Sequence, residues 1–133
     1  MPTRSAFTSA ALAANLAGDI HEIGKNLVAT LLSANGFEVH DLGVDVAPSA
    51  FAAKAAEVSA DLVGVSALLT TTMTGQRAVV EALNAAGLRP HVKVMVGGAP
   101  VTRAWAEEIG ADAYAEDAIA AVDTARRLLG VSA

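Results

Sequence analysis

An aspartate, a histidine and a glycine stand close together near the start of the chain, at Asp19, His21 and Gly24. Asp19 and His21 are two residues apart, so in an extended loop both side chains point the same way and the carboxylate can accept an imidazole N–H. That bond fixes the tautomer and frees the other ring nitrogen, which suits either a metal ion or a proton transfer. Gly24 would let a large ligand approach the backbone. Because Asp-x-His is also common in ordinary solvated turns, these residues alone leave a site and a turn as alternatives.

The residues that follow carry the pattern of an amphipathic helix. Ile23, Leu27 and Leu31 recur at helical spacing, with Val28 and Leu32 beside them. The loop that holds Asp19 and His21 would therefore lie at the positive end of a helix dipole. This gives the candidate site a plausible scaffold.

Bulk composition limits the classes of function. The chain has 133 residues, 53% of them apolar, which is enough for the core of one domain. A net charge of −5 without a long basic run argues against nucleic acid as a partner. The absence of cysteine excludes disulfides, a thiolate nucleophile and Cys-ligated zinc, and is compatible with the reducing cytoplasm, where we expect the protein. No stretch approaches the roughly 20 apolar residues that span a bilayer, so we expect no membrane association.

Apolar runs of strand length alternate with helical patterns, and Gly or Pro marks the joins, which is typical of βαβ units. Residues 12–16 have poor β propensity, but the first unit requires a strand there. Pro48 and Pro100 are expected in the first turns of helices. The expected strands cover residues 12–16, 37–42 (a half-exposed edge strand), 62–65 and 92–96. The expected helices cover residues 24–34, 49–59, 72–86, 101–109 and 117–129.

Five β/α units of this length predict an α/β fold, a flavodoxin-like or Rossmann-like doubly wound parallel sheet of order 2-1-3-4-5. Its switch point lies between strands 1 and 3, so the topology would bring Ser66 near Asp19 and His21. Strand 4 ends in Gly97-Gly98. Ser66 could instead cap a turn, residues 70–72 could cap a helix, and the glycines could form an ordinary turn. Together, however, these loops fit a large phosphate-bearing cofactor, because amides at a helix N-terminus bind phosphate.

These residues form a family pattern, Asp-x-His-x-x-Gly, then Ser-x-Leu, then Gly-Gly. Here it is Asp19, His21 and Gly24, then Ser66 and Leu68, then Gly97 and Gly98. From Gly18 to about Leu129 the chain resembles the cobalamin-binding domain of methionine synthase and of the corrinoid proteins in methanol and methylamine methyltransferase systems. Further similarity covers residues 24–26, 68–73, 96–102 and 110–118, and is greatest to the methyl-carrying corrinoid proteins.

The resemblance implies cobalamin as the cofactor, as methylcobalamin or a related corrinoid. His21 would displace the cofactor's dimethylbenzimidazole and ligate cobalt, with Asp19 and Ser66 in a hydrogen-bond chain behind it. The detached nucleotide tail would enter the domain beside strand 4. The residues implied to bind the cofactor are Asp19, His21, Glu22, Ile23, Gly24, Ser66, Leu68, Thr70, Thr71, Gly97, Gly98, Tyr114, Ala115 and Asp117.

The function implied is that of a non-catalytic methyl carrier between a methyl-donor-specific methyltransferase and an acceptor methyltransferase, with a reductive activase as a possible third partner. The cofactor domain of an adenosylcobalamin mutase and a corrinoid-dependent sensor remain alternatives. A response-regulator-like module is a remoter one, because a receiver would want a phosphorylatable Asp where this chain has Ser66. Only some 17 residues precede the motif, so we expect residues 1–133 to form a single cobalamin-binding domain without the N-terminal helical bundle of such corrinoid proteins.

Other notable side chains are expected to be structural. Trp105 and Ile109 share a helix face by their spacing, and with Met73 they are expected in the core. His40 and His91 are expected to face solvent.

Overall fold

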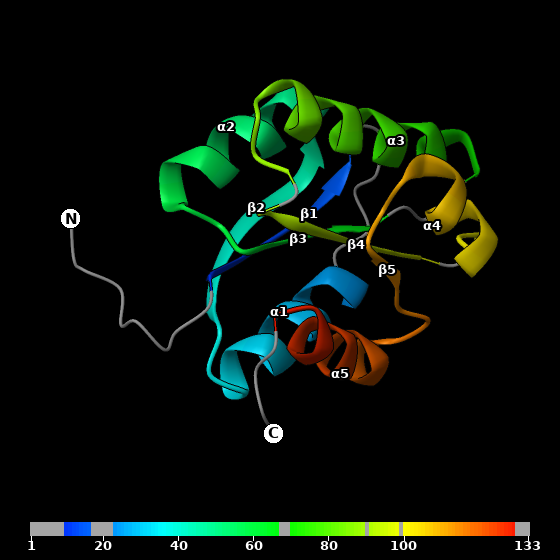
Figure 1. Cartoon of the computed structure of the whole chain (residues 1–133). Coiled ribbons are helices and arrows are strands. Elements are labelled where there is room, and N and C mark those ends of the chain that lie inside the picture. Colours follow the sequence, from blue (N-terminus) through cyan, green and yellow to red (C-terminus); the bar gives the residue numbers. More distant parts are fainter. Residues whose placement is uncertain (1–9, 17–22, 67–69, 90, 99, 130–133) are drawn as a thin grey trace.

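The computed structural model describes residues 10–16, 23–66, 70–89, 91–98 and 100–129 (Figure 1). Strands and helices alternate along them. The strands are β1 (Ala10–Leu16), β2 (Glu38–Val46), β3 (Leu62–Ser66), β4 (Lys93–Gly97) and β5 (Ala113–Tyr114). The helices are α1 (Ile23–Ala34), α2 (Pro48–Val58), α3 (Thr70–Ala85), α4 (Arg103–Ile109) and α5 (Ala118–Leu129).

The strands form one sheet in the order β2-β1-β3-β4-β5, and every neighbouring pair is parallel. The predicted order is confirmed, and so is the strand at residues 12–16. Its alanine-rich sequence is a poor strand former, but pairing with β2 on one side and β3 on the other outweighs that local preference. β2 lies at the edge of the sheet, as predicted, and extends beyond residue 42 to Val46.

The starts of the helices follow capping chemistry. Pro48 opens α2, as predicted. The expected place of Pro100 in a first turn is wrong, because α4 begins only at Arg103. Thr102 is its N-cap, and the Thr102 hydroxyl accepts the backbone N–H of Trp105 at 3.1 Å. Asp117 precedes α5, and its Oδ1 accepts the backbone N–H of Ala120 at 2.7 Å.

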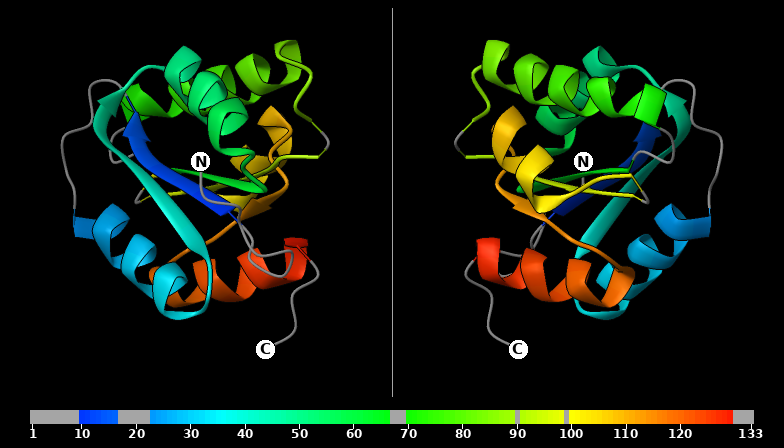
Figure 2. Two further views of the ribbon diagram at one scale, coloured as in Figure 1. Left: turned by 90° about the vertical axis from the view of Figure 1, so that its left-hand side faces the viewer. Right: turned by 90° about the vertical axis from the view of Figure 1, so that its right-hand side faces the viewer.

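The helices cover both faces of the sheet (Figures 1 and 2). Helices α2, α3 and α4 lie on one face, and α1 and α5 lie on the other. Each face has its own buried cluster. Val63, Val65, Val94 and Val96 pack under α2, α3 and α4, whereas Leu62 and Met95 pack under α1 and α5. This alternation along β3 and β4 is the burial on both faces that central parallel strands require.

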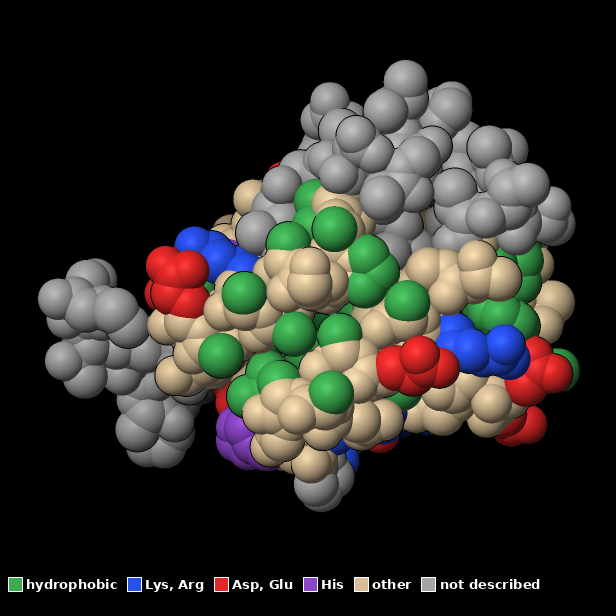
Figure 3. All heavy atoms as spheres, turned by 90° about the horizontal axis from the view of Figure 1, so that it is seen from above, with side chains coloured by type: hydrophobic (Ala, Val, Ile, Leu, Met, Phe, Trp, Pro, Cys, Tyr) green, Lys and Arg blue, Asp and Glu red, His purple; other side chains and the backbone are tan. Residues whose placement is uncertain are grey.

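The outer surface of the α2 and α3 layer carries small hydrophobic side chains, with charged side chains toward its margins (Figure 3). Several of them are exposed alanines of α2, such as Ala50, Ala53 and Ala56. The large apolar side chains of the two helices point to the sheet instead. Phe51 and Leu83 are fully buried, and Met73 packs against the same cluster, as predicted.

Asp112 joins β4 to the turn before β5. Its Oδ2 accepts the backbone N–H of Val94 at 2.7 Å and an Arg89 N–H at 3.0 Å. We predict that Asp112→Ala lowers the free energy of unfolding by about 1–3 kcal/mol, because it leaves a partly buried N–H and a guanidinium without their acceptor. Urea denaturation measures the loss. Asp123→Ala, at an exposed position of α5, is the control, and an equal loss in both variants would contradict the prediction.

Candidate functional site

The carboxyl ends of the three central strands lie in one row. Ser66 at the end of β3 pairs with Asn15 of β1 on one side and with Gly97 of β4 on the other. From this row β1 leads to α1 on one face of the sheet, and β3 leads to α3 on the opposite face (Figure 1). Ligands of doubly wound sheets bind at such a switch point.

The residues with which the sequence analysis began lie outside the described part of the chain. Asp19, His21 and Glu22 belong to the segment between Leu16 and Ile23, and Leu68 follows Ser66. The strands that lead into these two segments are paired neighbours. The contact of Asp19 and His21 with Ser66 therefore stays a prediction.

Four further predicted residues begin helices. Ile23 and Gly24 open α1, and Thr70 and Thr71 open α3, which starts two residues earlier than expected. The first amides of a helix have no partner within the helix, and the helix dipole makes this end positive. Two helix N-termini thus follow the neighbouring strands β1 and β3.

Ser66 is half-buried, and its face of the sheet follows from the alternation along β3. Val63 and Val65 pack under α2, α3 and α4, whereas Leu62 packs under α1 and α5. Ser66 is an even number of residues from Leu62, so its side chain lies on the α1 and α5 face. Gly97 follows Val96 in the same alternation and lies on that face beside Ser66.

Both glycines at the end of β4 are required by the protein's own backbone. A Cβ on Gly97 would lie 2.9 Å from the carbonyl oxygen of Ala115, which is closer than real Cβ atoms come. Gly98 has a φ of +123°, a conformation that residues with side chains rarely adopt. The Gly-Gly pair therefore has a structural explanation, and its contact with a ligand stays a prediction.

The sheet divides the predicted residues near its far edge. Tyr114 packs against the cluster under α2, α3 and α4, so it lies on the opposite face from Ser66. Ala115 is buried on the α1 and α5 face, and Asp117 caps α5. The structure thus brings Ala115 next to Gly97 but does not bring Tyr114 to Ser66.

A residue that the sequence analysis missed joins the strand ends from the other face. Gln76 of α3 is fully buried, and its Nε2 donates to the carbonyl oxygens of Val65 at 3.0 Å and of Gly97 at 3.1 Å. Its position was a usable signal, because Gln76 falls on the helical stripe of Val79, Val80 and Leu83. A polar residue on such a stripe needs buried partners.

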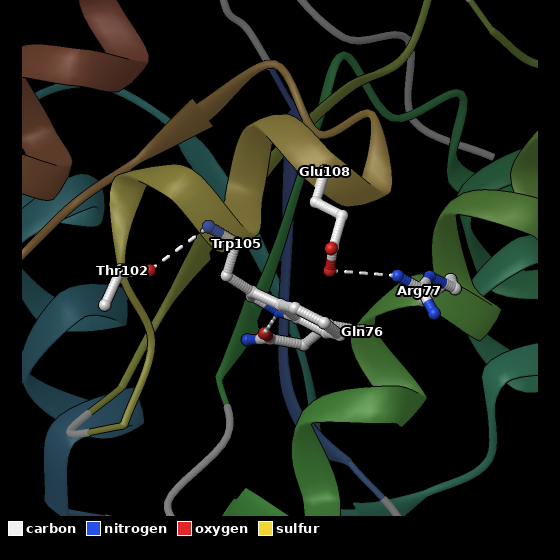
Figure 4. A network of polar contacts seen from close by, with 5 residues as sticks. All are labelled: Gln76, Arg77, Thr102, Trp105 and Glu108. Carbon is white, nitrogen blue, oxygen red and sulfur yellow. Dashed lines mark hydrogen bonds and ion pairs between the residues drawn. The ribbon is translucent and has the colours of Figure 1, made fainter.

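Trp105 of α4 completes this contact (Figure 4). Its indole N–H donates to Gln76 Oε1 at 2.9 Å. The Arg77 guanidinium lies 5.1 Å from the centre of the Trp105 ring, and Arg77 also pairs with Glu108 at 3.1 Å. Ile109 is buried, as predicted, but Trp105 is only half-buried and has this polar role as well.

Within the described ranges, no three His, Cys, Asp or Glu side chains gather to hold a metal ion. A metal held by one axial side chain would not form such a group. None of the described helices is long and apolar enough to cross a membrane.

The chain is similar in sequence and in fold to known proteins. A family model described as a B12 binding domain matches residues 9–123. Dimethylamine corrinoid protein 1 of Methanosarcina acetivorans is 54% identical over 131 residues, which cover 97% of this chain and 62% of that protein. The solved monomethylamine corrinoid protein of Methanosarcina barkeri is 47% identical with a TM-score of 0.86, over 90% of this chain and 57% of that one.

A third relative is the solved methanol:cobalamin methyltransferase complex of Methanosarcina barkeri. The matched chain of that complex is 30% identical to this chain with a TM-score of 0.86, and the match covers 92% of this chain and 47% of the matched one. The chain thus spans between 47% and 62% of the length of these three relatives.

The close approach of Gly97 to Ala115 yields a prediction. Gly97→Ala should lower the free energy of unfolding by about 1–3 kcal/mol, because the added methyl group overlaps the backbone oxygen of Ala115, which directly follows β5. Urea denaturation of the cofactor-free protein measures the effect. Ser66→Ala, at the paired position of β3, is the control. Equal stability of Gly97→Ala and the wild type would show that the end of β4 has room for a side chain.

Proposed function

The chain belongs to the B12-binding domain family, and from this we propose that it carries a methyl group on a corrinoid between two methyltransferases. The observation that carries the proposal is the 54% identity to a dimethylamine corrinoid protein over nearly the whole chain. Family membership makes cobalamin or a related corrinoid the cofactor of the domain. The bound corrinoid supplies a cobalt centre that can accept a methyl group from one partner and yield it to another.

The described residues fit a bulky, phosphate-bearing cofactor. Ser66 is small and half-buried at the switch point, and no side chain projects from Gly97 or Gly98 beside it. Helices α1 and α3 begin after the neighbouring strands β1 and β3, and their first amides, which have no acceptor within the helix, would be suited to bind phosphate or amide oxygens. Bulky or acidic side chains at these strand ends would have argued against such a cofactor.

We assign the axial cobalt ligand to His21. One ring nitrogen would bind the metal while the other donates its N–H to Asp19, with Ser66 next in the chain of hydrogen bonds. Asp19 would then hold the ring in one tautomer and stabilise the proton that His21 takes up on leaving the metal. The pairing of β1 with β3 supports this assignment, because Asp19 and His21 follow the end of β1 and Ser66 is the last residue of β3.

The partners we propose are a methyltransferase specific for the methyl donor and a second one for the acceptor. The relationship to a methanol:cobalamin methyltransferase complex supports methyltransferases as partners, and the names of the methylamine corrinoid proteins favour a methylamine as the donor. A reductive activase would restore cobalt after accidental oxidation. We further propose that residues 1–133 act as one cobalamin-binding unit, and that it works in the cytoplasm.

The ligand assignment predicts the outcome of a resonance experiment. With protein containing nitrogen-15 histidine and bound cobalamin reduced to cobalt(II), the axial nitrogen should give the coupling of histidine. That signal should vanish in His21→Ala. His40→Ala and His91→Ala are matched controls that remove the other two histidines, on β2 and before β4. A signal from dimethylbenzimidazole, or one that survives in His21→Ala, would refute the assignment.

The carrier role predicts dependence on partners. Reduced holo-protein mixed with dimethylamine should be methylated at cobalt only when a cognate methyltransferase is added, because the chain would hold the cofactor and leave donor activation to the partner. The change in corrinoid absorbance follows the reaction. Monomethylamine, trimethylamine and methanol, each with its own methyltransferase, determine the donor class. Repeated turnover of donor and acceptor by the isolated chain would show that it is an enzyme and not a carrier.

A further inference from the structure

Gln76 joins three elements at the level where the cofactor site begins. It extends from α3 to the carbonyl of Val65, which precedes Ser66, and to the carbonyl of Gly97, which precedes Gly98. Ser66 and Gly97 are also the last paired residues of β3 and β4. A single side chain thus bonds to the main chain of both strands near their ends.

Trp105 determines which way the Gln76 amide is turned. An indole N–H can only donate, so it must face the amide oxygen. The two N–H groups of the amide are then left for the two carbonyls, which can only accept. All three bonds agree with one orientation. The contacts of Arg77 with the Trp105 ring and with Glu108 hold the indole from its outer side.

We propose that Gln76, oriented by Trp105, is a positioning residue for the corrinoid site. It does not touch the cofactor. It fixes the main chain at Val65 and Gly97, and through it the place of Ser66 on the opposite face of the sheet. The proposal rests on the function proposed above, because it assumes that Ser66 belongs to the hydrogen-bond chain behind the cobalt ligand.

A role in packing alone does not explain this residue. The interior of β3 and β4 is already held by the regular pairing of Leu62 to Ser66 with Lys93 to Gly97, and leucine would fill the space of Gln76 at lower cost in desolvation. A buried amide can bind two main-chain carbonyls at once, which an apolar side chain cannot do. The two carbonyls that Gln76 binds belong to neighbouring strands, and they lie one residue before Ser66 and one residue before Gly98.

The test compares the cofactor affinity of variants whose stability is measured separately, so that a loss of affinity is distinguished from a loss of folded protein. Gln76→Leu removes all three bonds, and Trp105→Phe keeps a ring but removes only the donor that orients the amide. Val79→Ala is the matched control, because Val79 is fully buried on the same helix but lies outside the hydrogen bonds of Gln76. For each cofactor-free protein, urea denaturation gives the stability and nitrogen-15 spectra give the amide signals of Ser66 and Gly97. Titration with hydroxocobalamin then gives the affinity and the spectrum of the bound corrinoid.

We expect the affinity of Gln76→Leu for hydroxocobalamin to be about tenfold lower than that of Val79→Ala, and the loss in Trp105→Phe to be smaller. In both Gln76→Leu and Trp105→Phe, the amide signals of Ser66 and Gly97 should shift and the spectrum of the bound corrinoid should change. If Gln76→Leu does not fold, the milder Trp105→Phe decides. Affinity and spectrum equal to those of Val79→Ala, or unmoved Ser66 and Gly97 signals, would overturn the proposal. If the wild type itself bound no hydroxocobalamin, the proposed function would fail, and the Ser66 and Gly97 signals would still decide whether Gln76 positions the strand ends.

Discussion

The site depends on the parallel pairing of β1, β3 and β4 in one register. Parallel strands of a doubly wound sheet all end at the same edge, so Asn15, Ser66 and Gly97 come into one row although they are far apart in sequence. β1 then leads to α1 and β3 to α3, and these two helices lie on opposite faces of the sheet. The position of the candidate site thus comes from chain topology, and its side chains would only adapt it to a ligand.

The end of such a sheet has a physical cost. Carbonyls at the last residues lack the partners that the interior has, and buried ones must be satisfied in another way. Here the Gln76 amide binds two main-chain carbonyls near the ends of β3 and β4 from one face, while the Ala115 carbonyl lies close to Gly97 on the other. Gly97 is therefore constrained from both sides, which explains why glycine is required there before any cofactor is considered.

The Gln76 contacts come from the α2, α3 and α4 side of this row, and the residues on the α1 and α5 side are small. Ser66 and Gly97 lie there, and the large side chains Val63, Val65, Val94 and Val96 all point the other way. This is the edge of the sheet at which ligands of doubly wound folds bind.

The sequence determined the fold class, the strand order, nearly all of the helices and strands within a few residues, and the family. It could do so because hydrophobic periodicity and loop punctuation are local, and because Asp19, His21, Gly24, Ser66, Leu68, Gly97 and Gly98 recur in a fixed order. Residues 12–16 could be identified as a strand only because the βαβ pattern requires one there, since their alanines favour no strand.

Only the tertiary structure decided the rest. The partners of Gln76, the second role of Trp105 and the approach of Ala115 to Gly97 all join residues separated by many positions, so no local pattern encodes them. The face on which Tyr114 lies likewise follows from the pairing of β5 with β4. A strand of two residues is too short to be predicted from hydrophobic periodicity.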